Sequence, residues 1–251
     1  MKVLTLNTWQ EYGPWEKRWE IIFQGLDAYQ PDLIGFQEVF NPDWAKTVMK
    51  RSKFPYLVFS SDSSGLMFLS RFPVRQWSSY TMKTKSPTEN YKRYALFAEL
   101  EVGRNRLSVF NTHLSWQLDE GKIREEQVSE LLAFIQEKAP STETLVMGDF
   151  NSTCKTSEVR SMLDQGGFAD SFAVLHPEAP GLTWDNQNPF AAGSSHPLPD
   201  RRIDYIFIRN ASALLSGLVA SDIVFDQPNR EGIFASDHYG LLGTFKSKTG
   251  E

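Results

Sequence analysis

The 251-residue chain is poor in cysteine, and because Cys154 is its single one, no disulfide can form within the chain. That is compatible with a reducing compartment. Long apolar runs are lacking too, and no window approaches the roughly 20 apolar residues that span a bilayer. The apolar run in the N-terminal MKVLTLNTWQ is too short for the core of a signal peptide. We therefore expect a soluble, cytoplasmic, monomeric protein without stable membrane insertion.

The chain also lacks an excess of basic residues, and its net charge is -5. Tight, sequence-independent binding of nucleic acid usually depends on a basic face. The overall charge therefore argues weakly against such binding. It leaves open a local basic cleft, to which the pairs Lys92-Arg93 and Arg201-Arg202 could contribute.

Internal repeats, low-complexity tracts and flexible linkers are absent, so we expect a single domain over residues 1–251. The longest irregular stretch is 176–202, HPEAPGLTWDNQNPFAAGSSHPLPDRR. Loops of this length inside a compact domain are often functional. Its two histidines, His176 and His196, are expected to be solvent-exposed bystanders.

Hydrophobic periodicity and turn signals predict the regular elements of the chain. Strands are expected at 3–6, 32–37, 56–60, 65–70, 73–80, 94–101, 106–112, 145–147, 203–208, 217–225 and 239–246. Helices are expected at 14–26, 42–50, 119–138 and 157–164. Strand and helix alternate early, whereas the middle runs from strand to strand. This order predicts an α/β domain with two packed mixed sheets and helices outside.

Polar residues recur where these strands end, and the clearest case is GDFNS at 148–152, directly after the apolar run Thr144–Met147. Each such residue alone has an ordinary explanation as a cap, a turn or a satisfied buried group. Their number is what favours a common site. They are Asn7, Glu38, His113, Asp149, Asn151, Asp204, Asp237 and His238.

This set of side chains suits the hydrolysis of a phosphoric ester. The oxygens of Glu38, Asn7 and Asp237 are hard ligands that favour Mg²⁺ or Mn²⁺. Two imidazoles can stabilise a phosphoryl group, one carboxylate can activate a water, and another can hold an imidazole in the required tautomer. The residues therefore predict a metal-dependent hydrolase of phosphoric esters.

Six motifs in this order resemble the endonuclease/exonuclease/phosphatase superfamily: LTLNTW, FQEV, NTHL, GDFN, RRIDYIF and SDHY. They extend from residue 4 to residue 239, which is nearly the whole chain. The resemblance implies a four-layer α/β/β/α sandwich with two central mixed sheets.

The resemblance also implies roles for the residues that match its motifs. Glu38 would be the main metal ligand, with Asn7 and Asp237 nearby or at a second metal position. Asp149 would activate the water, and Asn151 would bind the phosphate and hold Asp149. His238, paired with Asp204, and His113 would contact the phosphate from opposite sides.

His113 discriminates among members of the superfamily. Abasic-site endonucleases usually carry a tyrosine at this position, so the histidine argues against an abasic-site endonuclease. Pancreatic-type deoxyribonucleases pair the equivalent histidine with a glutamate before a central strand. Here that stretch is SSDSSGLMFLSRFPV, in which Asp62 is the one acid, so the partner of His113 stays open.

Further stretches resemble sphingomyelinase-like and tyrosyl-DNA phosphodiesterase-like members, namely SGLMFLSRFPV and GLTWDNQNP. We interpret Trp184 and Asn186 as contacts to the non-phosphate part of the substrate; a Trp184 packed into the core is an equal alternative. Arg93 is a weaker candidate for a phosphate contact, against a surface position at a strand start. Cys154 is expected to be a small buried residue without a chemical role.

The leading hypothesis is a Mg²⁺- or Mn²⁺-dependent phosphodiesterase acting on a lipid, a small molecule or a DNA end. A DNA endonuclease or end-processing nuclease of the same superfamily is the alternative. A binding module that has lost catalysis is a remote third, because the metal, acid and imidazole positions are all filled.

Overall fold

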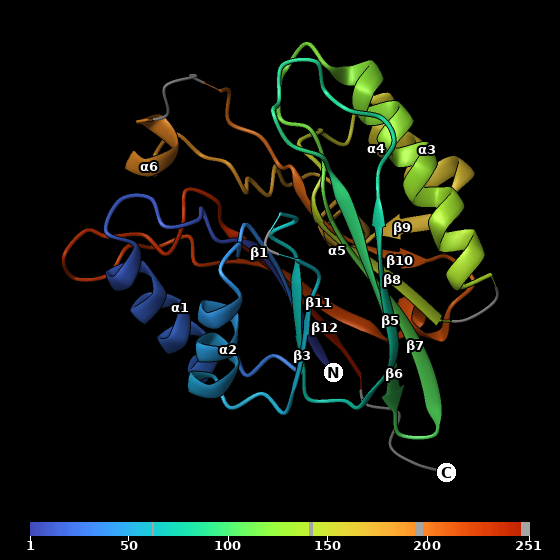
Figure 1. The fold of residues 1–251 in the computed structure, drawn as a ribbon, viewed down its shortest axis with the longest axis horizontal. Coiled ribbons are helices and arrows are strands. Elements are labelled where there is room, and N and C mark those ends of the chain that lie inside the picture. The colour runs from blue at the N-terminus through green and yellow to red at the C-terminus, as the bar shows by residue number, and fades with distance from the viewer. Residues whose placement is uncertain (62, 141–142, 194–197, 247–251) are drawn as a thin grey trace.

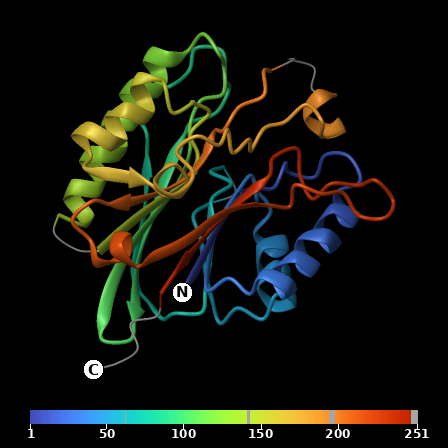
Figure 2. The same ribbon diagram turned by 180° about the vertical axis from the view of Figure 1, so that it is seen from behind.

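The computed structural model describes residues 1–246 except 62, 141–142 and 194–197. Two six-stranded mixed sheets pack face to face, with helices on both outer sides (Figure 1). Seen from behind, the same four layers run from the α1 and α2 side to the α3 and α4 side (Figure 2). The predicted four-layer architecture is confirmed. None of the helices in the described part of the chain is long and apolar enough to cross a membrane.

The first sheet has the strand order β11-β12-β1-β2-β4-β3. Its strands are β1 (Lys2–Asn7), β2 (Leu33–Gln37), β3 (Tyr56–Phe59), β4 (Met67–Ser70), β11 (Leu218–Val224) and β12 (Gly240–Phe245). β1 and β2 are parallel, whereas the other pairs are antiparallel. Asn7 and Gln37 are partners at the carboxyl ends of the parallel pair, so Glu38 follows directly at this edge.

The second sheet has the order β5-β6-β7-β8-β10-β9. Its strands are β5 (Val74–Thr81), β6 (Tyr94–Val102), β7 (Asn105–His113), β8 (Glu143–Asp149), β9 (Phe168–Asp170) and β10 (Asp204–Arg209). β7 and β8 are parallel, and His113 is the partner of Asp149. β10 runs antiparallel to β8 and begins with Asp204 beside Asp149. The register alone therefore brings these three residues to one edge.

The helices are α1 (Trp15–Tyr29), α2 (Pro42–Arg51), α3 (Gly121–Lys138), α4 (Ser157–Arg160), α5 (Ser171–Leu175), α6 (Pro189–Ala192) and α7 (Ala213–Gly217). α2 begins as its sequence predicts: the Asn41 side chain accepts hydrogen bonds from the Asp43 and Trp44 amides, and Pro42 takes the first turn. Trp19, Ile22, Phe23 and Leu26 form the buried face of α1.

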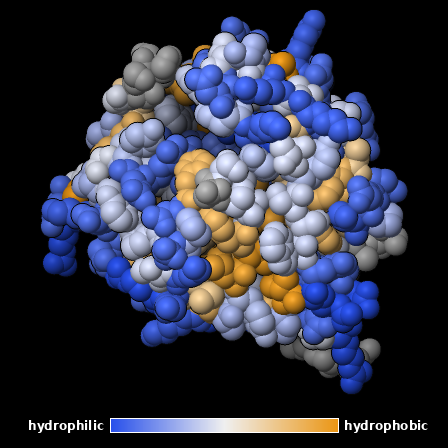
Figure 3. Space-filling model, viewed as in Figure 1, coloured by the Kyte–Doolittle hydropathy of each residue, from blue (hydrophilic) through white to orange (hydrophobic). Residues whose placement is uncertain are grey.

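Three apolar clusters hold the layers together. One lies between the sheets and includes Val3, Leu96 and Ile206. A second joins the first sheet to α1 and α2, and a third joins the second sheet to α3. In the space-filling view, hydrophobic side chains also gather near the middle of the face between the edge strands β3 and β5 (Figure 3).

Gly148 is required where β7 and β8 meet. Its φ is +135°, and a Cβ at this position would lie 2.0 Å from the carbonyl oxygen of Thr112. A side chain would therefore push apart the two strand ends that carry His113 and Asp149. The small residue of the GDFN motif is thus a condition for the neighbouring acid and imidazole to meet.

The structure corrects several boundaries and one residue. The expected helix at 157–164 is divided into α4 and a π-helical turn over Ser161–Gln165. The short elements β9, α5, α6 and α7 carry too little periodic sequence to be predicted. Cys154 is exposed, which contradicts the expected buried position, because it lies in the turn after GDFNS rather than in a packed element.

Candidate active site

Asp149 lies at the centre of the polar groups that the two sheets bring together. Its Oδ2 accepts a hydrogen bond from the Asn7 side chain of the other sheet at 3.1 Å. The same oxygen is 3.4 Å from His113 Nε2 and 3.7 Å from His238 Nε2. Its Oδ1 accepts from the Asn151 amide at 2.9 Å. Because both imidazole contacts are longer than good hydrogen bonds, both Nε2 atoms can turn toward a ligand.

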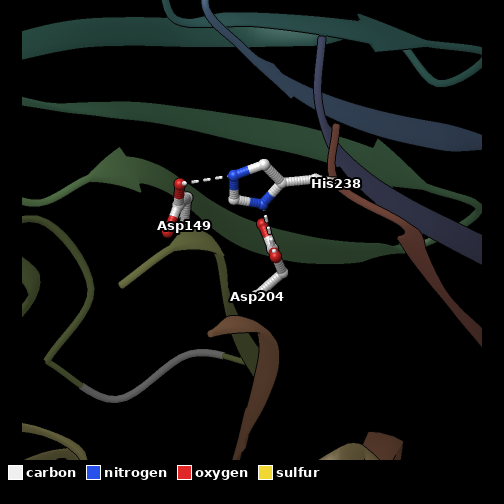
Figure 4. Close-up of side chains that lie close together, drawn as sticks. All are labelled: Asp149, Asp204 and His238. Atoms are coloured by element: carbon white, nitrogen blue, oxygen red, sulfur yellow. Dashed lines mark hydrogen bonds and ion pairs between the residues drawn. The ribbon is translucent and has the colours of Figure 1, made fainter. Parts of the chain in front are cut away.

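His238 is held by a second buried carboxylate. Its Nδ1 lies 2.9 Å from Asp204 Oδ2, while its Nε2 points toward Asp149 (Figure 4). Burial by itself lowers the pKa of His238, but the charges of Asp204 and Asp149 outweigh burial and raise it to about 10. His238 is therefore a cation at neutral pH, and both of its ring nitrogens can donate hydrogen bonds.

His113 has the opposite electrostatic environment. Burial holds its pKa well below the usual value, and the positive charges of Arg93 and His238 lower it further. Its Nδ1 is 3.9 Å from Glu38 Oε1. The carboxylates that contact His113 are thus Glu38 and Asp149, whereas Asp62, the acid near it in sequence, lies outside the described residues. Two histidines of different charge consequently flank one acid.

Carboxylates are in excess at the edge of the first sheet. Asn7 Nδ2 donates to Glu38 Oε1 at 3.2 Å. Burial raises the pKa of Asp237 to about 7, with His238 opposing and Glu38 adding to the rise. Burial and the neighbouring Asp204 raise the pKa of Asp149 to about 6, against the charge of His238. A divalent cation would relieve this repulsion, so the hard oxygen donors present fit Mg²⁺ or Mn²⁺.

Two groups of residues could hold such a cation. Asp149, Asp204 and His238 offer ligand atoms that all lie within 4.8 Å of one another. In this trio, however, Asp204 already bonds His238 and helps to keep it protonated, and a histidine must be neutral to bind a metal. The predicted set of Glu38, Asn7 and Asp237 contains no histidine. Within it, Asn7 Oδ1 already accepts a hydrogen bond from the Trp9 backbone amide at 3.0 Å, which leaves one lone pair of that oxygen for a cation.

The backbone is strained at two site residues. Glu38 has φ +65° and Asn151 has φ +50°, in the left-handed region that side-chain-bearing residues rarely adopt. Hydrogen bonds hold Asn151 there: its amide donates to Asp149, and its Nδ2 donates to the Leu114 carbonyl at 3.1 Å. Such strain concentrates at functional sites because the surrounding structure must enforce it.

A buried arginine connects two chain segments next to the site. Arg18 is fully buried and donates five hydrogen bonds, all to backbone carbonyls. Four of these carbonyls belong to the loop 8–12 after β1, and the fifth belongs to Ala235. The two segments also lie side by side in Figures 1 and 2. Burial lowers the pKa of Arg18 to about 10 against the favourable charges of Asp237 and Glu38.

A cleft of about 230 Å³ opens over Asp149, and its walls are rich in aromatic residues. Trp184 lines this cleft and also packs edge-on against His238, with ring centroids 5.1 Å apart. Trp184 is 6% exposed, so it both packs into the protein and forms part of the cleft wall. The other aromatic residues of the walls are Trp9, Tyr12, Tyr91 and Trp116.

Arg93 and Asn186 differ in how they relate to the cleft. Arg93 lines it and is buried, with its Nε and one terminal nitrogen donating to Glu89 at 2.8 and 3.0 Å. Asn186 is exposed and bonds Asp200 and the Leu198 carbonyl, so it fastens the loop rather than lining the cleft. His176 does not line the cleft, as expected, but it is half-buried beside Phe172 rather than solvent-exposed. His196 lies outside the described residues.

The model of the endonuclease/exonuclease/phosphatase family matches residues 4–238 of the chain. The chain belongs to this family. Among curated relatives, tyrosyl-DNA phosphodiesterase 2 of Mus musculus is 26% identical over 233 residues, covering 87% of the chain and 58% of the relative. The same protein of Bos taurus is 27% identical over 239 residues, covering 87% and 60%. The chain thus spans about three fifths of the length of these relatives.

Solved structures agree with the fold. The D. rerio TDP2 complex with a single-strand DNA product has a TM-score of 0.80 at 20% identity, covering 98% of this chain and 99% of that one. Beta toxin of Staphylococcus aureus has a TM-score of 0.76 at 20% identity, covering 98% and 100%. At 20% identity, these similarities concern the fold alone.

The sequence did not reveal the supporting residues Arg18 and Glu89. It also did not reveal the aromatic wall residues Trp9, Tyr12, Tyr91 and Trp116. Arg18 precedes the buried Trp19 on α1, where an amphipathic pattern predicts a solvated charge. Glu89 lies in an irregular segment and bonds both Arg93 and the Trp116 amide. Neither belongs to a motif, and no spacing in the sequence points to them.

Proposed function

We propose that this chain is a divalent-cation-dependent phosphodiesterase. The observation that carries the proposal is the buried carboxylate of Asp149 between a cationic His238 and a neutral His113. The carboxylate, which can accept a proton from water, thus lies close to two imidazoles that can donate hydrogen bonds to a phosphate. That combination is suited to attack of water on a phosphoryl group.

Each side chain has a distinct part in the proposed reaction. Asp149 orients the water and accepts its proton, and the Asn151 amide and Asn7 hold the carboxylate in place. The charge of His238 faces the phosphate oxygens as negative charge accumulates on them, while Asp204 keeps that imidazole protonated. His113 donates from the other side as a neutral imidazole.

Glu38, Asn7 and Asp237 would hold the cation. Bound there, Mg²⁺ or Mn²⁺ neutralises phosphate oxygens and stabilises an oxygen leaving group. It would also keep Asp149 and Asp237 ionised at neutral pH, since both have raised pKa values. Replacing Glu38 by Gln removes a charge from this set and is expected to weaken cation binding.

A DNA end is the substrate that we propose first. The support is the name of the curated relatives, tyrosyl-DNA phosphodiesterase 2, and the single-strand DNA product in the D. rerio complex. The aromatic walls of the cleft suit stacking of bases. A lipid or small-molecule diester is the alternative. Monomeric state and a cytoplasmic location remain predictions.

The test compares the parent with His238→Ala and with Asp164→Ala, an exchange on the outer helical layer. Substrates are an oligonucleotide with a tyrosine esterified to its end phosphate, supercoiled plasmid, sphingomyelin vesicles and bis-p-nitrophenyl phosphate, each with Mg²⁺ or Mn²⁺. We expect turnover of the tyrosyl oligonucleotide by the parent and the Asp164 variant, and a loss of about 10³-fold or more in the His238 variant.

Three outcomes would change this assignment. Plasmid nicking by the parent would make it an endonuclease. Turnover of sphingomyelin without the oligonucleotide would make the substrate a lipid. Equal turnover by parent and His238→Ala, in matched preparations, would remove the site assignment.

A further inference from the structure

Arg201 is a buried arginine beside the wall of the cleft. It forms an isolated bridge with Trp184, in which each backbone amide donates to the carbonyl of the other residue at 2.9 Å. Trp184 forms a second bridge with His238. Because bridge partners project to the same side, Arg201, Trp184 and His238 form one row. The row spans two strand spacings, roughly 10 Å, and ends at the imidazole beside Asp149.

The side chain of Arg201 differs from those of the other buried arginines. Arg201 is 6% exposed, and its Nε and Nη2 are enclosed without a hydrogen-bond partner among the described residues. By contrast, Arg93, Arg124 and Arg202 pair with carboxylates at 2.8, 3.0 and 2.7 Å, and Arg18 bonds backbone carbonyls. A buried charge without a partner destabilises a fold, so a ligand is the natural source of the missing partner.

The guanidinium of Arg201 lies within reach of the charges at the site. Burial lowers the pKa of Arg201, and the charge of Asp149 opposes burial. Arg124 lowers this pKa further, whereas Asp204 raises it. Neither acid accepts a hydrogen bond from Nε or Nη2 of Arg201. The two acids therefore attract Arg201 toward the site without satisfying its donors.

Trp184 adds another unpaired donor to the row. Its Nε1 is enclosed and has no partner in the described part of the chain. Trp184 and Leu198 line the cleft, and Arg201, next to Trp184, is not among the described lining residues. The planar fork of an arginine matches the oxygens of a phosphate or a carboxylate. An anion at this wall would thus meet two neighbouring residues with unsatisfied N–H groups.

We propose that Arg201, together with the Trp184 indole, binds a second anionic group of the substrate, a phosphate or a carboxylate that lies a few bonds from the scissile phosphoryl group. The long Arg201 side chain turns toward the cleft to meet this group. His238 and His113 face the scissile phosphate, so a substrate with a single negative charge leaves Arg201 unpaired. This inference rests on the proposed function and states which phosphodiesters the site prefers: those with a second anion, rather than those with neutral or cationic arms.

The test uses three chromogenic diesters that all release p-nitrophenolate. The first is thymidine 5′-(p-nitrophenyl phosphate) with a 3′-phosphate as the second anion, and the second lacks only that 3′-phosphate. The third is p-nitrophenylphosphorylcholine, which carries a cation instead. We compare kcat/KM for the parent, Arg201→Gln, Arg201→Lys and the control Arg160→Gln, which makes the same exchange at an exposed position of α4.

We expect the parent to favour the two-anion ester over the one-anion ester by about tenfold or more in kcat/KM. Arg201→Gln should reduce this preference to about threefold or less, and Arg160→Gln should keep it. Arg201→Lys should keep part of it, because the charge remains and the fork is lost. Turnover of the one-anion and choline esters should change little in Arg201→Gln.

Melting temperatures measure the same site without catalysis. Without ligand, Arg201→Gln should melt no lower than the parent, because it removes an unpaired buried charge. With Mg²⁺ present, thymidine 3′,5′-bisphosphate should raise the Tm of the parent more than thymidine 5′-monophosphate does. This difference should vanish in Arg201→Gln and persist in Arg160→Gln.

Equal kcat/KM for the two nucleoside esters in the parent would overturn the inference while leaving the proposed function intact. So would a preference that survives in Arg201→Gln, because the second anion would then bind elsewhere. An equal fall for all three esters would mean that Arg201 acts through Asp204 and not on the substrate, which also overturns the inference. If the parent hydrolyses none of the esters, the proposed function fails, and the shifts in Tm alone then decide whether Arg201 binds the second anion.

Discussion

Replacing Asp204 by Asn should remove much of the pH dependence of stability that His238 contributes. Asp204 is fully buried and bonds His238 Nδ1 at 2.9 Å. Asparagine has nearly the same shape, so packing against β8 and β10 is retained and the main change is the loss of one negative charge. Asp149 stays as the second charge that favours the imidazolium.

The magnitude follows from the two pKa values of His238, which are 6.5 in the unfolded chain and about 10 in the folded one. A folded pKa above the unfolded one means that the protonated imidazole stabilises the fold fully below pH 6.5. This stabilisation is lost as the pH rises through about 10. A rise of roughly 3.5 pH units, at about 1.4 kcal/mol for each, corresponds to on the order of 5 kcal/mol. Asp204→Asn should remove half of this or more.

The assay is urea unfolding with EDTA present, at a series of pH values from about 7 to about 10. The matched control is Asp170→Asn, another buried carboxylate, which pairs with Arg202 rather than with a histidine. The control should lower the free energy of unfolding without changing its slope against pH. If Asp204→Asn keeps the parent's slope, then Asp204 does not hold the proton on His238, and our account of the site's electrostatics is wrong.

Three further exchanges test other parts of the site. Arg18→Lys leaves at most three donors for five carbonyls. We therefore expect a free energy of unfolding in urea that is about 2–4 kcal/mol lower, and a higher Mg²⁺ concentration for half-maximal activity. An unchanged Mg²⁺ requirement would leave Arg18 with a purely structural role. Gly148→Ala places a Cβ 2.0 Å from the Thr112 carbonyl oxygen and should lower the free energy of unfolding by about 3 kcal/mol or more. In the control Gly217→Ala, the Cβ meets no atom within 4 Å, so this exchange should be tolerated. Similar melting temperatures for the two variants would contradict this expectation. Glu38→Gln should weaken Mg²⁺ binding about tenfold or more in calorimetric titration, and unaltered affinity would exclude Glu38 as the main ligand.

Much of the fold follows from local sequence patterns. The apolar strands and helices α1 and α2 depend on periodicity and on a few neighbouring residues, so their expected ranges lie close to the observed bounds. The four layers were expected from the family resemblance together with the order of the elements. Short elements such as β9 and α5 exist because tertiary packing holds them, and their few residues carry no periodic signal.

The candidate site was visible in sequence because its residues lie at strand ends, where motif and register coincide. Which residues carry charge was not visible. His113 and His238 each contact two carboxylates. Burial and the charges of Arg93 and His238 hold His113 neutral, whereas the charges of Asp204 and Asp149 outweigh burial at His238 and keep it cationic. Residues 93, 149, 204 and 238 meet only when the sheets form.

The sequence by itself determined the types of chemical group available, the strands that end in them and the family to which they belong. Tertiary structure alone decided the protonation states of the two histidines and the link that Arg18 makes between two segments far apart in the chain. The physical reason is range. Propensity and periodicity act between residues a few positions apart, whereas burial and Coulomb interactions depend on which residues pack together, however far apart they lie in the chain.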